Sequence, residues 1–162
     1  MKIHLGSGKK YKEGYVNVDI EESVKADVYH DLNSYPYPFE ENSAKEIIAC
    51  HVIEHLDDQS TFLKELHRIL KPGGVAIIEC PIGGTWSSYH VNHKNNLTPY
   101  SFKILEPKSK WAFQFPFHFK IKRMSVFMPI VYDKVHFPWR FIYVNCFVNN
   151  VFTKMKAELV KV

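Results

Sequence analysis

Three groups suited to binding a nucleoside follow successive strand-like segments early in the sequence: Gly6-Ser7-Gly8, Asp19 and Asp31. In an open parallel sheet the carboxyl ends of the strands meet at one edge, so we expect these groups to lie together. Glycine backbone lets a ligand approach closely and presents N–H donors. A carboxylate after the second strand can accept both hydrogen bonds of a ribose diol. One after the third can accept an adenine amino proton while Leu32 packs on the ring. Each aspartate alone is also typical of a strand-end cap, but their order predicts a nucleoside site.

The spacing of these groups argues against a dinucleotide ligand. The dinucleotide fingerprint requires a third glycine where Tyr11 stands. Only nine residues separate Leu5 from Tyr15, fewer than a parallel crossover with a full helix needs. The first helix is therefore predicted to be vestigial, one turn at Lys9–Lys12, which leaves no helix N-terminus for a pyrophosphate. The sequence favours a ligand without phosphates.

Strand and helix patterns alternate along the chain. The one strong helical pattern runs from Phe62 to Leu70, with Asp58 or Ser60 as its cap and Pro72 after its end. The alternation predicts an α/β fold, a Rossmann-like three-layer sandwich around a mainly parallel sheet with an antiparallel strand near the C-terminus. Strands are predicted at residues 2–5, 15–20, 26–30, 46–50, 75–80, 117–128 and 155–162, a short helix at 99–105, and an aromatic helix or loop at 138–152.

Charged and aromatic residues are distributed unevenly over the 162 residues. Residues 1–80 hold 9 Lys and Arg against 14 Asp and Glu, a net charge of −5. Residues 81–162 hold 12 against 3, a net of +9, and 17 of the 24 aromatic side chains. We expect a single domain over 1–162, with a cofactor-binding half at 2–82 and a substrate-side half at 83–162. The basic half suits an anionic acceptor or a membrane surface, or its cations only solubilise the aromatic side chains.

Several classes of protein are disfavoured by composition. The N-terminus lacks the architecture of a signal peptide, and no stretch approaches the roughly 18 apolar residues of a membrane span, so a cytoplasmic location is expected. Cys50, Cys80 and Cys146 are too widely spaced for a disulfide framework or a zinc ribbon. No nucleic-acid recognition motif is present, so no nucleic-acid partner is expected.

The same residues belong to a longer pattern that resembles class I S-adenosylmethionine (SAM)-dependent methyltransferases. It is most similar to a small, methyltransferase type 11-like group that often occurs in sugar or cell-surface pathways. The resemblance covers residues 2–82, with two departures: Ser7 stands where members often have cysteine, and Ala44-Lys45 where they usually have Phe-Asp. It is carried by Leu5-Gly6-Ser7-Gly8, Gly14-Tyr15-Val16-Asn17-Val18-Asp19-Ile20, Asp31-Leu32-Asn33, His51-Val52-Ile53-Glu54-His55-Leu56 and Leu66-His67-Arg68-Ile69-Leu70-Lys71-Pro72-Gly73-Gly74.

The resemblance implies SAM as cofactor, no metal, and a role for each matching residue. Leu5, Gly6, Ser7 and Gly8 would line the methionine part, Asp19 and Ile20 would hold the ribose, Asp31 and Leu32 the adenine, and Cys50 and His51 would border the methionine and the substrate entrance. The reaction would transfer a methyl group to a small-molecule or saccharide or lipid-linked acceptor. Because SAM carries the reactive carbon, the protein mainly aligns it with a nucleophile. A hydroxyl acceptor would need a base, for which His51, His90 and His93 are the candidates.

Three alternatives remain open on the sequence. His51-Val52-Ile53-Glu54-His55 matches the HxxEH pattern of inverted zinc peptidases, which require the motif on a helix and a third ligand. The reduced first helix also allows a non-catalytic SAM-binding module. Finally, residues 137–143 combine aromatic side chains with a cation, as in peripheral membrane contacts or in a cap packed over a substrate site. The sequence does not indicate an oligomeric state.

Overall fold

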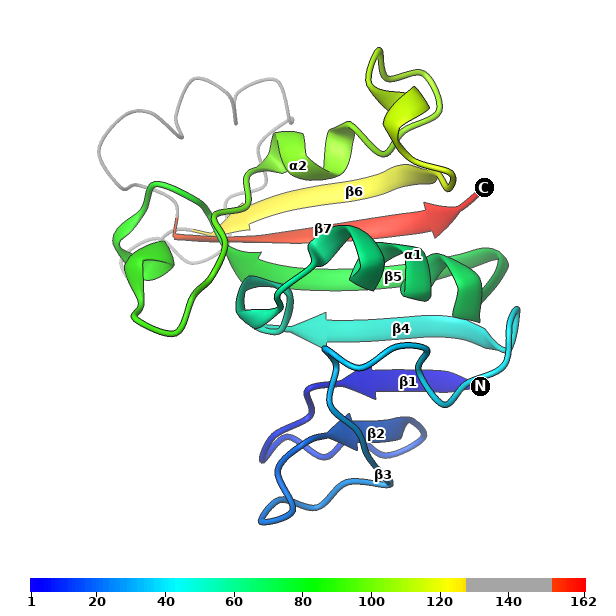
Figure 1. The fold of residues 1–162 in the computed structure, drawn as a ribbon, viewed down its shortest axis with the longest axis vertical. Helices are drawn as coiled ribbons and strands as arrows, with labels where there is room; N and C mark the ends of the chain where they lie inside the picture. Colours follow the sequence, from blue (N-terminus) through cyan, green and yellow to red (C-terminus); the bar gives the residue numbers. More distant parts are fainter. Residues whose placement is uncertain (128–152) are drawn as a thin grey trace.

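The computed structural model describes residues 1–127 and 153–162, which form one seven-stranded sheet in the order β3-β2-β1-β4-β5-β7-β6 (Figure 1). The first five strands are parallel, and β7 is antiparallel to both of its neighbours. This confirms the predicted mainly parallel, Rossmann-like sheet with an antiparallel strand near the C-terminus. The strands are β1 (Lys2–Leu5), β2 (Val16–Asp19), β3 (Val28–Tyr29), β4 (Ala44–Cys50), β5 (Leu70–Pro81), β6 (Phe119–Phe127) and β7 (Lys154–Lys161).

The order of the strands reverses between β1 and β4. From β1 the chain adds β2 and then β3 on one side, and it returns to pair β4 with the other side of β1. Loops that leave β1 and β4 therefore diverge at their carboxyl ends. Such a switch point is where open α/β sheets bind ligands.

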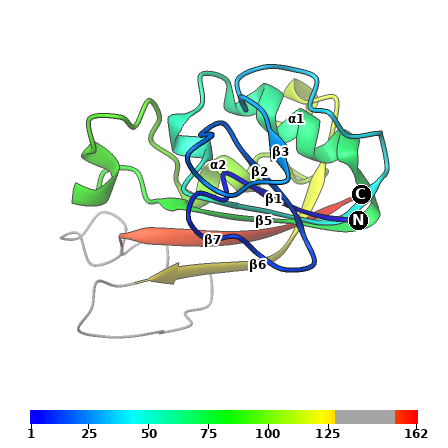
Figure 2. The ribbon, with the colours of Figure 1, turned by 90° about the horizontal axis from the view of Figure 1, so that it is seen from below.

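One face of the sheet is covered by both helices, α1 (Gln59–Ile69) and α2 (Pro99–Lys103), as Figure 2 shows edge-on. Helix α1 begins where the Asp58 carboxylate accepts a hydrogen bond of 2.9 Å from the Thr61 N–H, the role of an N-cap. Its apolar side chains pack on the alternate, fully buried residues of the strands. The largest of these buried residues include Ile3, Ile47, Phe62, Leu66, Ile69 and Ile78.

The opposite face carries polar side chains on the central strands. Lys2 pairs with Glu46 across β1 and β4 at 3.4 Å, and Lys154 pairs with Glu79 across β7 and β5 at 2.7 Å. Within residues 1–127 and 153–162, no helix lies on this face (Figure 2). Of the three layers expected from the sequence, the described residues thus form the sheet and one helical layer.

The connection between β1 and β2 differs from the prediction of a helical turn at Lys9–Lys12. It holds two turns and no helix: the Lys10 N–H donates to the Ser7 carbonyl at 2.9 Å, and the Tyr15 N–H donates to the Lys12 carbonyl at 3.3 Å. The reason lies in Asn17, whose buried side chain accepts from the Lys12 N–H at 2.8 Å and donates to the Lys12 carbonyl at 3.1 Å. A side chain from β2 thus satisfies the loop backbone, as a helix otherwise would.

Three short 3-10 helices complete the described elements: η1 (Ile53–His55), η2 (Trp86–Tyr89) and η3 (Ala112–Gln114). None of the helices in the described part of the chain is long and apolar enough to cross a membrane. The predicted aromatic segment at 138–152, the candidate membrane contact at 137–143 and Cys146 lie outside the described residues.

Candidate cofactor and substrate site

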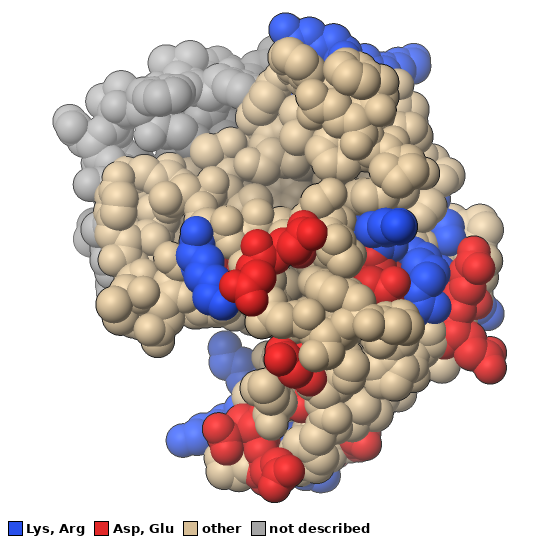
Figure 3. Space-filling view, in the orientation of Figure 1, with Lys and Arg blue, Asp and Glu red and all other residues tan. Residues whose placement is uncertain are grey.

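A cavity of about 390 Å³ opens at the carboxyl ends of β1, β2, β3 and β4. It coincides with an indentation of the surface on the left of Figure 3, above the part that holds β2 and β3, and Asp and Glu side chains gather beside it. The lining residues are Gly6, Asp19, Ile20, Asp31, Leu32, Asn33, His51, Val52, His55 and Leu56. The cavity therefore occupies the switch point between β1 and β4, where a nucleoside site was expected.

Gly6 forms the floor of the cavity, and its conformation requires glycine. Its φ is +61°, a region that side chains disfavour. A Cβ atom built on Gly6 would lie 2.4 Å from Cγ2 of Val52, which also lines the cavity. The absence of a side chain therefore both permits the turn after β1 and keeps space for a ligand above the backbone.

Asp19 is held in a fixed orientation at the end of β2. Its Oδ2 accepts a hydrogen bond of 2.7 Å from the Gly8 N–H, and its Oδ1 accepts one of 3.0 Å from the Glu21 N–H. Each carboxylate oxygen can accept a second hydrogen bond. The neighbouring Ile20 is 63% exposed, so its apolar side chain is available to a ring bound beside the carboxylate. A preorganised acceptor next to exposed apolar surface fits the ribose end of an adenosine.

Asp31 and Leu32 lie on the loop that leaves β3, and this loop is tied to the neighbouring segments. Asp31 Oδ1 accepts from the Asn33 N–H at 2.9 Å, and Asn33 Oδ1 accepts from the Asp57 N–H at 2.9 Å. The Leu32 carbonyl accepts a 2.7 Å hydrogen bond from the hydroxyl of buried Tyr37. The acceptor and the apolar side chain expected at an adenine are thus fixed relative to η1.

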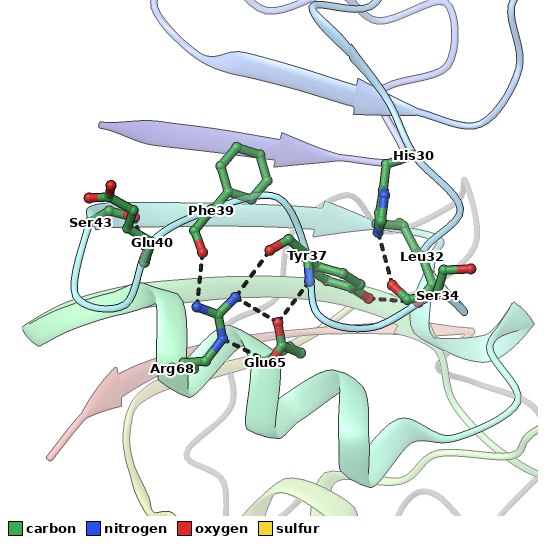
Figure 4. A network of polar contacts seen from close by, with 9 residues as sticks. All are labelled: His30, Leu32, Ser34, Tyr37, Phe39, Glu40, Ser43, Glu65 and Arg68. Carbon is green, nitrogen blue, oxygen red and sulfur yellow. Dashed lines mark hydrogen bonds and ion pairs between the residues drawn. The ribbon is translucent and has the colours of Figure 1, made fainter.

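A part-buried ion pair on α1 anchors this loop to the helix (Figure 4). Glu65 binds Arg68 through two contacts of 2.9 Å and also accepts from the Tyr37 N–H at 3.0 Å. Arg68 in turn donates to the carbonyls of Tyr37 and Phe39. Burial raises the pKa of Glu65, but the hydrogen bonds from Arg68 and Tyr37 outweigh burial and lower it overall. Burial also raises the pKa of the Tyr37 hydroxyl, which stays protonated and donates.

The predicted cofactor residues fall into two groups. Six of them line the cavity together: Gly6, Asp19, Ile20, Asp31, Leu32 and His51. The other four do not. Leu5 is 1% exposed in the core, Ser7 is buried, and Gly8 contributes its N–H to Asp19. Cys50 lines a different hollow, with His4 and Ile48 among its neighbours. The physical reason for Cys50 is the alternation of side chains along β4, which turns it to the face opposite Ala49.

Four cavity residues were not predicted as site residues: Asn33, Val52, His55 and Leu56. All four belong to the motifs that carried the family resemblance, which was the available signal. Hydrophobic periodicity could not identify them, because three of them lie within or beside η1. A 3-10 helix of three residues is too short to produce a periodic pattern in the sequence.

The three candidate bases are not equivalent. His51 lines the cavity, adopts a left-handed φ of +56°, and places Nδ1 3.1 Å from Oε1 of buried Glu54. A left-handed conformation at a non-glycine residue is a strained feature that clusters at functional sites. His93 packs edge-on against His55, with ring centroids 4.8 Å apart, and His90 lies 5.2 Å from His93. His90 and His93 thus do not line the cavity but lie beside it, next to His55.

The HxxEH pattern does not adopt the conformation of a zinc peptidase motif. Its first two residues precede η1, and only Ile53–His55 are helical. His51 lies against Glu54, whereas in such peptidases the glutamate serves as the base beside two metal-bound histidines.

Comparison with known proteins agrees with this geometry. Residues 8–78 match the family model described as "Methyltransferase domain". The chain is 36% identical over 63 residues to a probable S-adenosylmethionine-dependent methyltransferase of Mycolicibacterium smegmatis, covering 39% of this chain and 24% of that protein. It is 32% identical over 75 residues to demethylmenaquinone methyltransferase of Geobacillus stearothermophilus, covering 43% and 32% respectively. The chain therefore spans a quarter to a third of the length of these relatives.

Solved structures share the fold. The crystal structure of a SAM-dependent methyltransferase from Archaeoglobus fulgidus superimposes with a TM-score of 0.67 at 17% sequence identity. The match covers 99% of this chain and 85% of that one. It includes β6 and β7, which lie outside the family match, so the resemblance in fold extends beyond the resemblance in sequence.

Proposed function

We propose that this chain is a class I SAM-dependent methyltransferase that binds SAM in the cavity at the ends of β1–β4 and transfers its methyl group to a hydroxyl-bearing acceptor. The observation that carries the proposal is the convergence of the Gly6 backbone, Asp19 and Asp31 on one cavity at the switch point. The open backbone at Gly6 suits the amino-acid tail, and the two carboxylates suit the ribose and the adenine.

The chemistry asks little of the protein beyond alignment and removal of one proton. SAM supplies a methyl group on a cationic sulfur, which retains the bonding electron pair when the methyl group bonds to the acceptor oxygen. We assign His51 as the group that takes the hydroxyl proton because it lines the cavity. Its Nδ1 lies 3.1 Å from Glu54 Oε1, and its Nε2 lies 3.8 Å from Glu79 Oε1. Glu54 is a positioning residue in this scheme.

The acceptor is proposed to be an anionic saccharide or lipid-linked saccharide. Two features support this choice: the net charge of +9 over residues 81–162, and aromatic side chains left exposed in the same half. Tyr89 is 72% and Phe113 is 79% exposed, and Lys110 lies 5.0 Å from the ring centroid of Trp111. Exposed rings beside cations offer apolar contact to sugar faces and attraction to an acidic group.

Calorimetry with SAM and with its demethylated product tests the cofactor site. We expect both compounds to bind to the unaltered chain. In Asp19→Ala their affinity should fall by about tenfold or more, because unpaired ribose hydroxyls cost roughly 1–3 kcal/mol of binding free energy. Glu22→Ala, an exposed carboxylate change in the same acidic segment, controls for net charge and should bind as the unaltered chain does. Equal affinity for all three proteins would refute the assignment of Asp19.

Transfer itself is tested with methyl-labelled SAM. The label should appear in an acidic saccharide or in a lipid-linked saccharide pool, and His51→Gln should lower turnover by a larger factor than it lowers SAM affinity. Binding of SAM without transfer to any acceptor offered would instead favour the non-catalytic binding module.

A further inference from the structure

A second set of polar side chains meets beside the cavity: Glu54 and His55 of η1 and His93 of the loop that follows η2. Each residue offers one ligand atom, and the three atoms lie within 4.8 Å of one another. Two imidazoles and one carboxylate are the donor set of many zinc and other transition-metal sites.

Glu54 supplies a buried carboxylate oxygen that lacks a partner. The residue is 1% exposed, its Oε1 faces His51, and its Oε2 has no hydrogen-bond partner among the described residues. The same holds for the buried Nδ1 of His93. A buried polar atom without a hydrogen-bond partner is energetically unfavourable. A cation bound between these groups would satisfy both.

His55 already has the outer contact typical of a metal-bound histidine. Its Nδ1 lies 3.0 Å from the Asn92 carbonyl, to which it donates. Because a carbonyl only accepts, this contact places a proton on Nδ1, which leaves Nε2 as the ring atom available to a metal. His55 also lines the cavity, so a metal at this position would stand at the cavity wall.

The two segments that supply the ligands are fastened to each other. The Lys94 N–H donates to the Glu54 carbonyl at 2.9 Å, and the Asn95 side chain donates to the Leu56 carbonyl at 2.7 Å. An ion pair of 2.5 Å joins Lys94 to Asp57. These contacts hold His93 against η1 without help from a bound ion, as a preorganised site requires.

We infer that Glu54, His55 and His93 bind one divalent transition-metal ion, zinc by preference, with a coordination position open toward the cavity. Three protein ligands with an open position characterise catalytic rather than structural zinc sites. In that role the inference rests on the proposed function: the metal would hold an acceptor hydroxyl near His51 and ease loss of its proton. Metal binding itself does not depend on methyl transfer.

The test uses the full chain, stripped with a chelator and titrated with zinc chloride in a calorimeter. We expect one zinc per chain. Glu54→Gln and His93→Ala should each weaken zinc binding by about 100-fold or more, since even outer-shell changes cost roughly 10–100-fold. His30→Ala, which removes a half-buried histidine outside the cluster, is the control and should leave zinc affinity unchanged. Cobalt(II) added in place of zinc should give a visible d–d spectrum that both ligand variants lose.

Folding and cofactor binding are checked separately for each variant by circular dichroism and by calorimetry with the demethylated product of SAM. His93→Ala alters a half-buried loop residue, so the inference stays testable even if Glu54→Gln fails to fold. Zinc binding that is no stronger in the unaltered chain than in the folded His93→Ala variant would overturn the metal site. Retained binding of the SAM product in that case would leave the proposed function standing.

Discussion

Gly6 is the residue at which the backbone and the cavity constrain the sequence most tightly. A side chain at this position would be unfavourable for two separate reasons: the positive φ, and the 2.4 Å distance between its Cβ and Cγ2 of Val52. Gly14 also has a positive φ, +78°, but there is open space around the position that its Cβ would take.

This pair allows the two costs to be measured apart. We expect Gly6→Ala to lower stability by more than the roughly 1–2 kcal/mol of left-handed strain and to abolish measurable SAM binding, because the new methyl group enters the cavity. Gly14→Ala should show the strain alone and bind SAM normally. Urea denaturation and calorimetry on both variants give the comparison, and similar SAM affinities would contradict this account of Gly6.

At the residue scale the sequence could predict the groups that come directly after strands and little else. Asp19 and Asp31 were identifiable because each occupies such a position, and the ends of parallel strands converge. Cys50 lies away from the cavity because the last residue of β4 still obeys the alternation of the strand. His55 meets His93 because two contacts, His55–Asn92 and Lys94–Asp57, each join residues that are 37 positions apart in the sequence. No local sequence pattern encodes such long-range contacts.

At the scale of elements, α1 shows which of two predicted caps is used. The Asp58 carboxylate accepts from both the N–H and the hydroxyl of Thr61, and these hydrogen bonds lower its pKa. We expect Asp58→Ala to reduce the free energy of unfolding by about 1 kcal/mol, the usual cost of losing an N-cap. Ser60→Ala, at the alternative cap position, should change it by only a few tenths of a kcal/mol. Urea denaturation near pH 7 is the measurement, and a larger effect at Ser60 would reverse the assignment.

The segment between β3 and β4 contacts both α1 and the cavity: Tyr37 bonds to Glu65 of α1 and to the carbonyl of Leu32, which lines the cavity. Tyr37→Phe removes the hydrogen bond to the Leu32 carbonyl and leaves that buried oxygen unpaired. We expect a loss of roughly 1–3 kcal/mol in stability together with weaker SAM binding, since Leu32 lines the cavity. Tyr29→Phe removes a comparable hydrogen bond, 2.9 Å to the Val24 carbonyl, from an exposed tyrosine. It should have little effect, and SAM binding unchanged in Tyr37→Phe would disprove the coupling.

Element boundaries were predictable where one strong pattern acted alone. Strands β1, β4, β5 and β7 and helix α1 follow apolar periodicity, and all appear at or near the predicted residues. The predicted strand at 26–30 shrinks to the two residues of β3, whose only partner in the described sheet is the short β2. β5 starts at Leu70, earlier than expected, because Leu70 pairs with Ala44 directly after α1 ends. Such pairings depend on long-range contacts that override local propensity.

At the scale of the whole molecule, histidines that are buried or half-buried make stability depend on pH. Burial lowers the pKa of His67, on α1, and of His4, on β1, below the usual value of 6.5. Because the unfolded chain then binds protons more readily, their contribution to stability is complete above about pH 6.5 and is lost as pH falls toward the folded-state values. The free energy of unfolding should therefore decline between about pH 7.5 and pH 5.5.

A substitution separates His67 from the other titrating groups. His67→Leu should show a smaller decline over the same pH interval, because an apolar side chain beside Phe119 has no proton to gain. In His30→Ala, which alters a half-buried histidine after β3, the free energy of unfolding should decline as it does in the unaltered chain. Unfolding curves in urea at the two pH values provide the test, and parallel declines in all three proteins would argue against a role for His67.

The seven-stranded sheet ends in two strands that limit its growth in different ways. β3 offers only two residues, too short a template for another chain to extend. β6 is long, but Lys120, Lys122 and Arg123 are exposed along it, so a strand from a second molecule would have to bury cations there. Within residues 1–127 and 153–162, both edges of the sheet thus carry features that oppose edge-to-edge aggregation.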